Sequence, residues 1–483
     1  MSLDKTEIKM EEDVVNRTGS FSSMDDQPFE QFKEEKKFVR KLSWSLLPLV
    51  WCIVFVQFVD KAMLAVAAVT GLLQDTQMTA SQYSWASSVV YLGYLVYQIP
   101  NNILIQRLPH AKYLGVLITL WGVTVCATCA VQTFQQLMGL RFLLGLFEAG
   151  SNPVLYIILN TLYRRSEQSA VFGFMIISSG SGSAVGSAIG VAITYTLDHV
   201  HGWRAWRWGY LIFGVITIFL GIVTFFLLID KPTSKLLRLT EAEKKIVEER
   251  GKDNMVVKTK LIKRYQIWEA LKEPRLWCLC FGMLLLNLQN GGLISYSALL
   301  VQSLGFTSQE SVILQIPSGI ASATYVLISI IGARKSTQTI FTAMTLICVS
   351  LIGLITLVAS NNVGGRLAGY YLSWAQAAGQ ALIITIIGNN VSGYTKKVTY
   401  NGTLTVFFTL GNFIGPLMMV PPTYLGGLLG YLASNIVTIL LLGYVRWDMA
   451  IINKRRSQNG TSEKTDPALD LTDKEDVNYV YRL

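Results

Sequence analysis

Residues 46–68, LLPLVWCIVFVQFVDKAMLAVAA, decide the fold, because this apolar stretch is long enough to cross a lipid bilayer as one helix. Such a crossing needs about 20 predominantly apolar residues. Asp60 and Lys61 interrupt the stretch. A charged side chain at the centre of a membrane helix costs about 2.5–3.5 kcal/mol on insertion scales. Charges there usually face a polar cavity and act in it, so Asp60 and Lys61 are candidate functional residues.

Eleven further apolar stretches of similar length follow along the chain. The 483 residues are 51% hydrophobic and only 15% charged, whereas soluble proteins carry about a quarter charged residues. We therefore predict an all-α membrane protein with twelve transmembrane helices in two six-helix halves. Pro421-Pro422 is the only clear break between the last two spans. The predicted spans are 46–68, 83–105, 113–132, 138–160, 169–195, 208–229, 276–300, 310–332, 338–359, 366–388, 400–420 and 424–446.

The loops between these spans alternate in charge, which predicts the orientation of the chain. By the positive-inside rule the basic loops are cytoplasmic, and both termini are then cytoplasmic too. The net charge of +10 follows from this topology, so we expect no nucleic-acid partner. We expect a multi-pass protein of the plasma membrane, with an internal membrane as the alternative. The basic loops carry Arg107, Lys112, Arg164, Arg165, Arg334, Lys335, Lys396 and Lys397, and the opposite loops carry only Arg204, Arg207 and Arg366.

Polar segments divide the chain into five parts. Within the linker, Thr240 is expected to cap a cytoplasmic helix that continues through Glu249. Gln98-Ile99-Pro100 and Gln315-Ile316-Pro317 lie six spans apart, as parallel six-helix repeats would place them. The predicted parts are a cytoplasmic tail without the apolar core of a signal peptide (1–43), a six-helix bundle (44–230), a cytoplasmic linker (231–275), a second six-helix bundle (276–446) and a polar cytoplasmic tail that we expect to be disordered (447–483).

The predicted span 138–160 holds a second pair of charged residues, Arg141 and Glu148. They are seven residues apart, so they lie on the same helix face about 10 Å apart along the axis. That separation is too long for an easy direct pair, and Asp60 and Lys61 supply the complementary charges. We predict a neutral network across helices in which Asp60 pairs with Arg141 and Lys61 pairs with Glu148. A structural ion network that fixes helix register is the alternative interpretation.

The charges of this network predict a mechanism. With both carboxylates ionised the four residues are neutral overall and attract an anion weakly. Protonation of Asp60 and Glu148 leaves Lys61 and Arg141 unpaired, so they attract a carboxylate, and a bound anion favours protonation in return. The emptied carrier re-forms its internal pairs and reorients without an unpaired charge. The hypothesis is proton–anion symport by alternating access, with a small anionic substrate and protons as partners within the lipid bilayer.

Uncharged polar residues in the spans are further substrate-binding candidates. Tyr94 and Gln98 lie on roughly one face of the second span, Asn287 lies in the seventh span and Asn412 in the eleventh. Each can instead hydrogen-bond a neighbouring helix, which is the alternative interpretation for all four. The fifth span also carries a stripe of small residues that predicts close helix packing: Gly182, Gly186 and Gly190.

The sequence offers no support for an enzyme. No nucleotide-binding loop, metal-ligand cluster or nucleophile–base arrangement is visible in it. The six cysteines lie within apolar spans, and Cys126 and Cys129 have a metal-like spacing without a partner pair or a histidine nearby. We therefore expect no metal, no cofactor and a monomeric protein.

Three longer motifs run through the spans: Ser87–Tyr94 continuing into Gln98-Ile99-Pro100, Arg141–Ala149, and Gly393–Lys397 followed by Gly411–Pro416. With these motifs the chain, from Lys41 to Arg446, resembles the fungal allantoate-permease branch of the anion:cation symporters, within the major facilitator superfamily. The resemblance implies a twelve-helix carrier that imports a small carboxylate or a related nutrient, such as a ureido acid or a vitamin acid, together with protons.

The resemblance also implies roles for particular residues. It implicates the four charged residues in proton coupling and anion binding, and it gives Tyr94 and Asn412 positions in the substrate cavity. The first-span base is usually Arg in this family, and here it is Lys61, which cannot hold a carboxylate through two parallel hydrogen bonds. The identity of the substrate is therefore not implied. Two alternatives are a proton-coupled exporter of drugs or metabolites and a non-transporting nutrient receptor of the same fold.

Overall fold

The computed structural model describes residues 4–253, 263–336, 338–421, 424–459 and 470–483. Within these ranges every regular element is a helix. The first half contains α1 (Asp4–Ala67), a π-helix (Ala68–Leu72), α2 (Leu73–Asp75), α3 (Ala80–Arg107), α4 (His110–Thr128), α5 (Phe134–Glu148), α6 (Ser151–Leu162), α7 (Arg165–Leu197) and α8 (Ala205–Leu227). After α9 (Glu241–Asp253) and α10 (Arg264–Leu271), the second half contains α11 (Pro274–Ser303), α12 (Ser308–Ile313), α13 (Ile316–Ser336), α14 (Thr339–Ala359), α15 (Val363–Ser373), α16 (Gln376–Asn390), α17 (Tyr394–Leu417) and α18 (Leu425–Asn459).

The helices confirm the all-α membrane fold that the hydropathy pattern predicts. Each of the twelve predicted spans coincides with one helix or with two helices in a row. Among the described residues, nine helical segments are long and apolar enough by themselves to cross a membrane. The three remaining predicted spans are α3, α15 with α16, and α17, whose polar side chains lower their hydropathy.

Three of the predicted spans are broken in the middle, where continuous helices were expected. The breaks separate α5 from α6, α12 from α13 and α15 from α16. Pro153 and Pro317 account for the first two, because a proline cannot donate a hydrogen bond to the residue four positions earlier and its ring clashes with that carbonyl. Those earlier residues are Ala149 and Ile313, which lie at the ends of α5 and α12.

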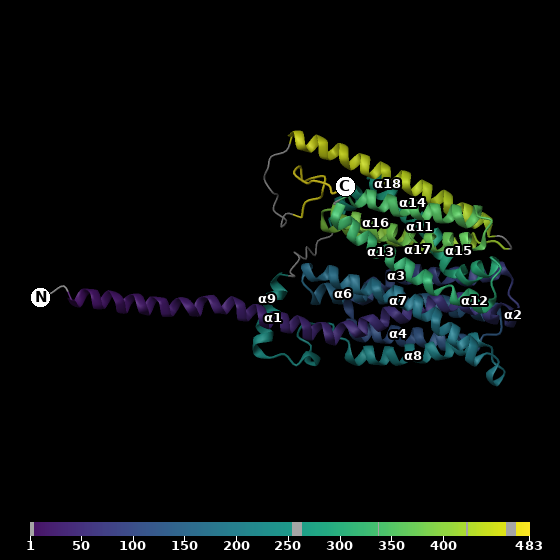
Figure 1. Cartoon of the computed structure of the whole chain (residues 1–483), viewed down its shortest axis with the longest axis horizontal. Helices are drawn as coiled ribbons and strands as arrows, with labels where there is room; N and C mark the ends of the chain where they lie inside the picture. The colour runs from purple at the N-terminus through teal and green to yellow at the C-terminus, as the bar shows by residue number, and fades with distance from the viewer. Residues whose placement is uncertain (1–3, 254–262, 337, 422–423, 460–469) are drawn as a thin grey trace.

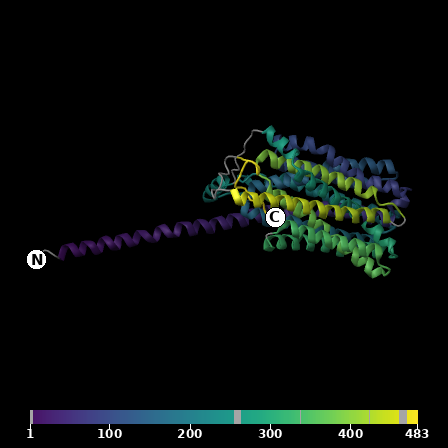
Figure 2. The same cartoon turned by 90° about the horizontal axis from the view of Figure 1, so that it is seen from above.

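The helices form two bundles that lie side by side, the first built from α1 to α8 and the second from α11 to α18 (Figure 1). Seen from above, the same two groups run roughly parallel to each other, and the N-terminal part of α1 extends beyond them (Figure 2). We call the end that carries α9, α10 and residues 470–483 the linker end, and the opposite end, with α2, the far end.

Small residues and tyrosines bring the two bundles into contact away from the linker end. A Cβ atom added to Gly319 in α13 would lie 2.9 Å from the backbone nitrogen of Ala184 in α7, so these helices touch through their backbones. Nearer the far end, the Tyr83 hydroxyl of α3 donates a hydrogen bond to the Ser295 carbonyl of α11 at 2.6 Å. The bundles are thus joined toward the far end.

The predicted packing of the small-residue stripe in α7 is confirmed, and α1 is the helix that packs on it. A Cβ atom added to Gly182 would lie 2.5 Å from the Phe55 carbonyl oxygen, and one added to Gly186 would lie 3.0 Å from the Val59 Cα. This close approach fixes the position of α1, which carries Asp60 and Lys61.

Several described parts of the polar segments at the linker end form helices or pack on the bundles. The predicted linker helix is confirmed as α9, and the Thr240 hydroxyl accepts a hydrogen bond from the Glu243 backbone N–H at 3.3 Å, as a capping residue does. The expectation of a disordered C-terminal tail is wrong for two segments. Residues 447–459 continue α18, and residues 470–483 pack against the second bundle. Their polar side chains find partners on that bundle, which composition alone does not reveal.

Candidate functional site

Lys61 and Glu148 form an ion pair inside the first bundle. The Lys61 ammonium nitrogen lies 3.1 Å from the Glu148 Oε1 atom, and the Glu148 side chain is 1% exposed. Lys61 stands one helical turn after Gln57 on α1, so both face α5, where Glu148 is the last residue. The predicted pairing of Lys61 with Glu148 is therefore confirmed. The four charged residues Asp60, Lys61, Arg141 and Glu148 are called the charged site below.

A glutamine and a tyrosine complete the surroundings of Glu148. The Gln57 amide donates a hydrogen bond to Glu148 Oε1 at 2.8 Å and lies 3.3 Å from the Tyr94 hydroxyl. The Tyr94 hydroxyl in turn lies 3.4 Å from the Glu148 backbone carbonyl oxygen. Gly93 and Gly145 permit this, because a Cβ atom on either would collide with the backbone of the facing helix. Three helices, α1, α3 and α5, thus meet at one carboxylate.

The predicted direct pair of Asp60 with Arg141 is wrong. Arg141 instead donates a hydrogen bond to the Tyr210 hydroxyl of α8, and its guanidinium lies 5.6 Å from the centre of that ring. Asp60 is 3% exposed, and neither of its carboxylate oxygens has a hydrogen-bond partner among the described residues. No ion pair joins Asp60 and Arg141 among the described residues.

Several polar atoms of the charged site are buried without a hydrogen bond within the described part of the chain. Most buried polar atoms in proteins have at least one partner, so a group of exceptions at one place needs a reason. The carboxylate oxygens among them can take up a proton, and the others can hydrogen-bond a polar ligand. They are Gln57 Oε1, Asp60 Oδ1 and Oδ2, Arg141 Nε and Glu148 Oε2.

The second bundle places amides, and no charge, in a comparable network. The Asn412 amide donates to the Asn287 carbonyl oxygen at 2.8 Å, and the Asn290 amide donates to the Asn412 carbonyl oxygen at 2.9 Å. Gln380 donates to Asn287 at 3.2 Å, and Gln376 donates to Asn290 at 3.1 Å. Asn287 and Asn412 are thus brought together, and α11, α16 and α17 are tied by side-chain amides. We call these five residues the amide network.

Gln98 lies apart from the other candidates. It is half-buried on α3, one turn beyond Tyr94 toward the linker end, and makes no hydrogen bond to another candidate within the described residues. Sequence reasoning missed Gln57 and Tyr210. The helical spacing between Gln57 and Lys61 is a signal that would have found the first, whereas no local pattern marks Tyr210 as the partner of Arg141.

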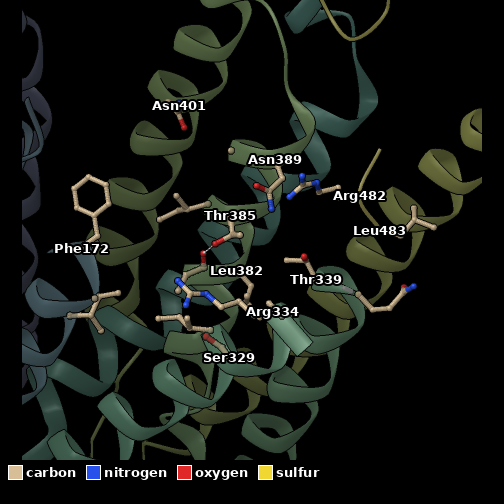
Figure 3. A pocket seen from close by; sticks show the side chains of 18 of the residues that line it. Phe172, Ser329, Arg334, Thr339, Leu382, Thr385, Asn389, Asn401, Arg482 and Leu483 are labelled. Carbon is tan, nitrogen blue, oxygen red and sulfur yellow. Dashed lines mark hydrogen bonds between the residues drawn. The ribbon is translucent and has the colours of Figure 1, made fainter. Parts of the chain in front are cut away.

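A cavity of about 1330 Å³ opens between the two bundles toward the linker end (Figure 3). Residues of α6 and α7 line one side and residues of α13, α16 and α17 line the other, together with residues 481–483 of the C-terminal tail. None of the eight predicted site residues lines it. Because the bundles touch toward the far end and separate here, the pair of bundles is open at its linker end.

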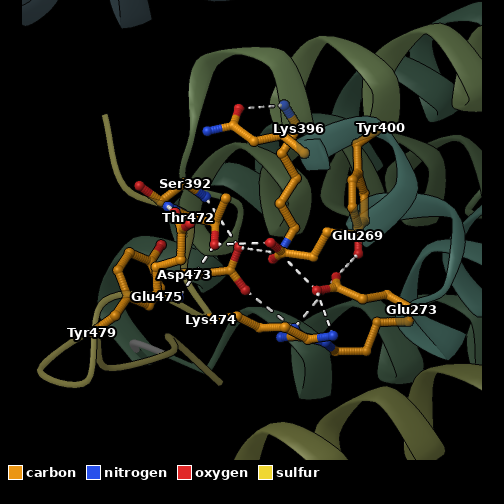
Figure 4. A network of polar contacts seen from close by, with 12 residues as sticks. Glu269, Glu273, Ser392, Lys396, Tyr400, Thr472, Asp473, Lys474, Glu475 and Tyr479 are labelled. Carbon is orange, nitrogen blue, oxygen red and sulfur yellow. Dashed lines mark hydrogen bonds and ion pairs between the residues drawn. The ribbon is translucent and has the colours of Figure 1, made fainter. Parts of the chain in front are cut away.

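A second buried group of charges holds the C-terminal tail on the second bundle (Figure 4). The Lys396 ammonium lies 2.6 Å from Glu273, 2.7 Å from Asp473 and 2.8 Å from Glu269, and Arg275 lies 3.1 Å from Asp473. Burial alone raises the pKa of Asp473, but Lys396 and Arg275 outweigh that effect, so its pKa lies below the usual value of 3.8. These five residues form what we call the anchor cluster.

The described residues contain no group of three or more His, Cys, Asp or Glu side chains arranged to hold a metal ion.

Comparisons with known proteins agree with this architecture. A family model described as Major Facilitator Superfamily matches residues 50–416. An uncharacterized transporter of Schizosaccharomyces pombe is 32% identical over 469 residues, covering 93% of this chain and 90% of that protein. The allantoate permease of Saccharomyces cerevisiae is 31% identical over 478 residues, covering 93% of this chain and 87% of that protein.

Among solved structures, a bacterial homolog of the human lysosomal transporter Spinster, in an inward-facing and unoccupied conformation, has the same fold. Its TM-score is 0.61 at 14% identity, covering 83% of this chain and 94% of that chain. The matched family model spans most of the helical bundle, and the permease is similar from end to end. The chain belongs to the major facilitator superfamily, in the fungal branch that includes allantoate permease.

Proposed function

We propose that this membrane transporter imports a small organic anion by proton symport with alternating access. The observation that carries the proposal is the ion pair of Lys61 with Glu148, whose carboxylate is 1% exposed. A buried ion pair is weak evidence for stability, because desolvation of the charges offsets much of their attraction. Ionisable residues inside membrane helices most often mark substrate or proton pathways.

The exchange of partners at Lys61 couples proton and anion. When Glu148 takes up a proton, the ammonium of Lys61 loses its counter-charge and attracts a carboxylate in its place. When the anion leaves, the proton leaves Glu148 and the ion pair re-forms, so the empty carrier reorients with its charges paired. Gln57 and Tyr94 hold the Glu148 side chain and backbone during this cycle through the contacts at 2.8 Å and 3.4 Å.

Asp60 and Arg141 supply a second pair of charges for the same cycle. Asp60 has two buried oxygens that make no hydrogen bond of normal geometry among the described residues, with the Trp121 indole N–H beside them, so a proton can add to this carboxylate. Protonation of Asp60 leaves Arg141 without a nearby compensating carboxylate, and its free Nε–H then faces the anion. We infer that Asp60 and Glu148 couple protons, and that Lys61 and Arg141 bind the anion.

The amide network supplies an uncharged counterpart from the opposite bundle. Asn290 and Gln380 are half-buried, whereas Asn287, Gln376 and Asn412 are fully buried. Amides both donate and accept hydrogen bonds, so they suit the polar, uncharged part of a substrate. A small carboxylate with an amide or ureido group fits both halves, and the similarity to allantoate permease supports this class. Asn287 and Asn412 are proposed binding residues, with Tyr94 and Gln98 on the first bundle.

The orientation follows from the basic loops. We propose that the linker end faces the cytoplasm, that both termini lie there, and that the carrier acts as a monomer in the plasma membrane. In this orientation the cavity at the linker end is the site of anion release.

The test is pH-dependent uptake by cells that express the chain, with labelled allantoate, nicotinate, pantothenate, biotin, cysteine and a sulfonate. Uptake of one anion that rises at acid pH and stops with a protonophore supports symport. Glu148→Gln and Lys61→Ala should abolish accumulation, whereas Glu310→Gln, which changes an exposed acid at the far end, should not. No uptake of any compound despite surface expression contradicts the proposal, and then outward transport, or growth signalling without transport, is measured instead.

A further inference from the structure

The cavity at the linker end is lined by two positive side chains and by no acidic side chain among the described residues, and the terminal carboxylate of Leu483 is the one negative group on it. Two of the described residues that line it are arginines, Arg334 from α13 and Arg482 from the C-terminal tail, and none is Asp or Glu (Figure 3). Neither arginine side chain makes an ion pair or a hydrogen bond within the described residues. Arg334 and Arg482 therefore add two positive charges to a concave surface that carries one negative charge, at Leu483.

Some other basic residues near this end of the molecule are paired, whereas Arg334 and Arg482 are not. Four of them meet carboxylates at 3.0 Å or less. The paired residues are Lys41 with Glu243, Arg250 with Glu167, Lys263 with Asp470 and Lys396 with Glu273. In the cavity, by contrast, the positive charges of Arg334 and Arg482 can interact with a bound anion.

Arg482 reaches the cavity because its backbone is fixed on both sides. The Asn390 side chain accepts a hydrogen bond from the Arg482 N–H at 2.7 Å and donates one to the Arg482 carbonyl at 2.9 Å. The next residue, Leu483, accepts a hydrogen bond from the Thr339 N–H at 2.8 Å. These three hydrogen bonds fix the backbone of the last two residues of the tail.

The anchor cluster holds the same tail from its other side. Asp473 is 1% exposed and contacts both Lys396 and Arg275, while the Tyr481 hydroxyl donates to Asp473 at 2.6 Å. The tail is therefore docked by buried charges, and its exposed arginine is presented toward the cavity.

We propose that Arg334 and Arg482 form an anion-binding site at the linker end, which attracts small carboxylates and which is complete only when the C-terminal tail is docked. The site is separate from the charged site, since none of Asp60, Lys61, Arg141 or Glu148 lines this cavity. As a step in transport the proposal rests on the proposed function, because the released anion passes here. The positive charge that the two arginines give to the cavity does not depend on any substrate.

The experiment measures the charge of the cavity directly. Thr385 lines the cavity and is exposed, so Thr385→Cys places a reactive thiol there in the full-length protein. The purified protein is reacted at low ionic strength with an anionic and a cationic methanethiosulfonate of similar size, and the parent chain without Thr385→Cys gives the background. The quantity recorded is the ratio of the anionic to the cationic reaction rate.

Arg482→Gln should lower this ratio by about fivefold, as expected when one unit charge roughly 8 Å away in water acts oppositely on the two reagents. Arg334→Gln should lower it similarly, and Arg482→Lys should preserve it. Asp473→Asn should also lower it by releasing the tail. Lys335→Gln, which removes a neighbouring exposed charge that does not line the cavity, is the matched control and should leave the ratio unchanged.

An unchanged ratio in Arg482→Gln overturns the proposal, and so does an equal fall in Lys335→Gln. Because Arg482 is exposed, its substitution should not unfold the chain, so the test does not depend on Asp473→Asn folding. If the ratio falls as expected but no anion is transported, the proposed function fails while the anion site stands. If an anion is transported but the ratio does not change, the proposed function stands and the anion site at the linker end is overturned.

Discussion

The charged site and the anchor cluster are both buried groups of acidic and basic residues, yet they differ in how completely their charges are paired. In the anchor cluster Lys396 contacts three carboxylates, and Asp473 contacts Lys396, Arg275 and Tyr481. In the charged site only Lys61 and Glu148 form an ion pair, and both oxygens of Asp60 lack hydrogen bonds among the described residues.

This difference separates a group of charges that stabilises the fold from a group that can take part in transport. Removing one member of a fully partnered group of buried charges lowers the free energy of unfolding strongly, because the other members stay buried without their partner. Such a group therefore holds segments together. Partly partnered charges retain atoms that can exchange partners with a proton or a ligand. The comparison therefore predicts that substitutions in the anchor cluster change stability first, whereas substitutions in the charged site change transport first.

The largest effect is expected for Lys396→Met. Removal of this 0% exposed ammonium takes the nearest cation from the buried Glu273 and Asp473 and leaves Arg275 to face both, which should cost up to about 3–5 kcal/mol of stability. Thermal unfolding of the purified protein measures it as a lower Tm. The adjacent Lys397→Met removes an exposed ammonium that donates a hydrogen bond to the Gly388 carbonyl, and should cost less than about 1.5 kcal/mol. Equal losses in both variants would break the comparison.

Glu148→Gln should reduce proton-driven accumulation about a hundredfold or more while the Tm changes little. The amide cannot take up and release a proton at physiological pH, so the exchange of partners at Lys61 stops. Exchange of labelled for unlabelled anion across the membrane should persist, because it needs no net proton movement. Loss of folding in this variant, in place of loss of accumulation, would instead support a structural ion network.

Gln57→Leu should lower uptake about tenfold, a smaller effect than that of Glu148→Gln. It removes the 2.8 Å hydrogen bond to the Glu148 carboxylate, and hydrogen bonds to charged groups contribute about 1.5–3 kcal/mol. The change should appear in the maximal rate of uptake measured at saturating substrate. The exposed Gln135→Leu in α5 is the matched control, and an equal decrease there would remove Gln57 from the site.

The smallest effect is expected from pH on the docked tail. The pKa of Asp473 is lower in the folded protein than its usual value of 3.8, so its contribution to docking is complete above that value and is lost as pH falls through the lower, folded pKa. Hydrogen-exchange protection of residues 470–483 should therefore stay constant from pH 8 to pH 5. A loss of protection within that range would show that another group controls docking.

The sequence predicted most of the fold and about half of the charged site's contacts. Apolar length along the chain is a local property, so all twelve spans and the helix after Thr240 were predictable. The pairing of Lys61 with Glu148 followed from charge and depth. The partner of Arg141 did not, because Tyr210 comes from α8 and reaches Arg141 only through the rotation of that helix in the bundle.

The docking of residues 470–483 was equally beyond sequence reasoning. Asp470, Asp473 and Glu475 look like the acidic residues of any solvated tail. Their partners lie on segments that are distant in sequence, such as Lys396 and Arg275, and only the folded bundle brings these cations together. A polar composition predicts that a segment will not form its own core, but it does not say whether a neighbouring surface will bind it.

The backbone contact between α7 and α13 has a consequence for how this chain tolerates mutation. Gly319 has no room for a methyl group beside Ala184, whereas the next residue, Ile320, is 57% exposed at the outer surface of the bundle. Position 319 should therefore tolerate almost no substitution, whereas position 320 should tolerate most apolar residues. A saturation mutagenesis profile of α13 would identify the positions at which the two bundles touch. Random variation should accumulate at the outer surface of the carrier long before it accumulates at those positions.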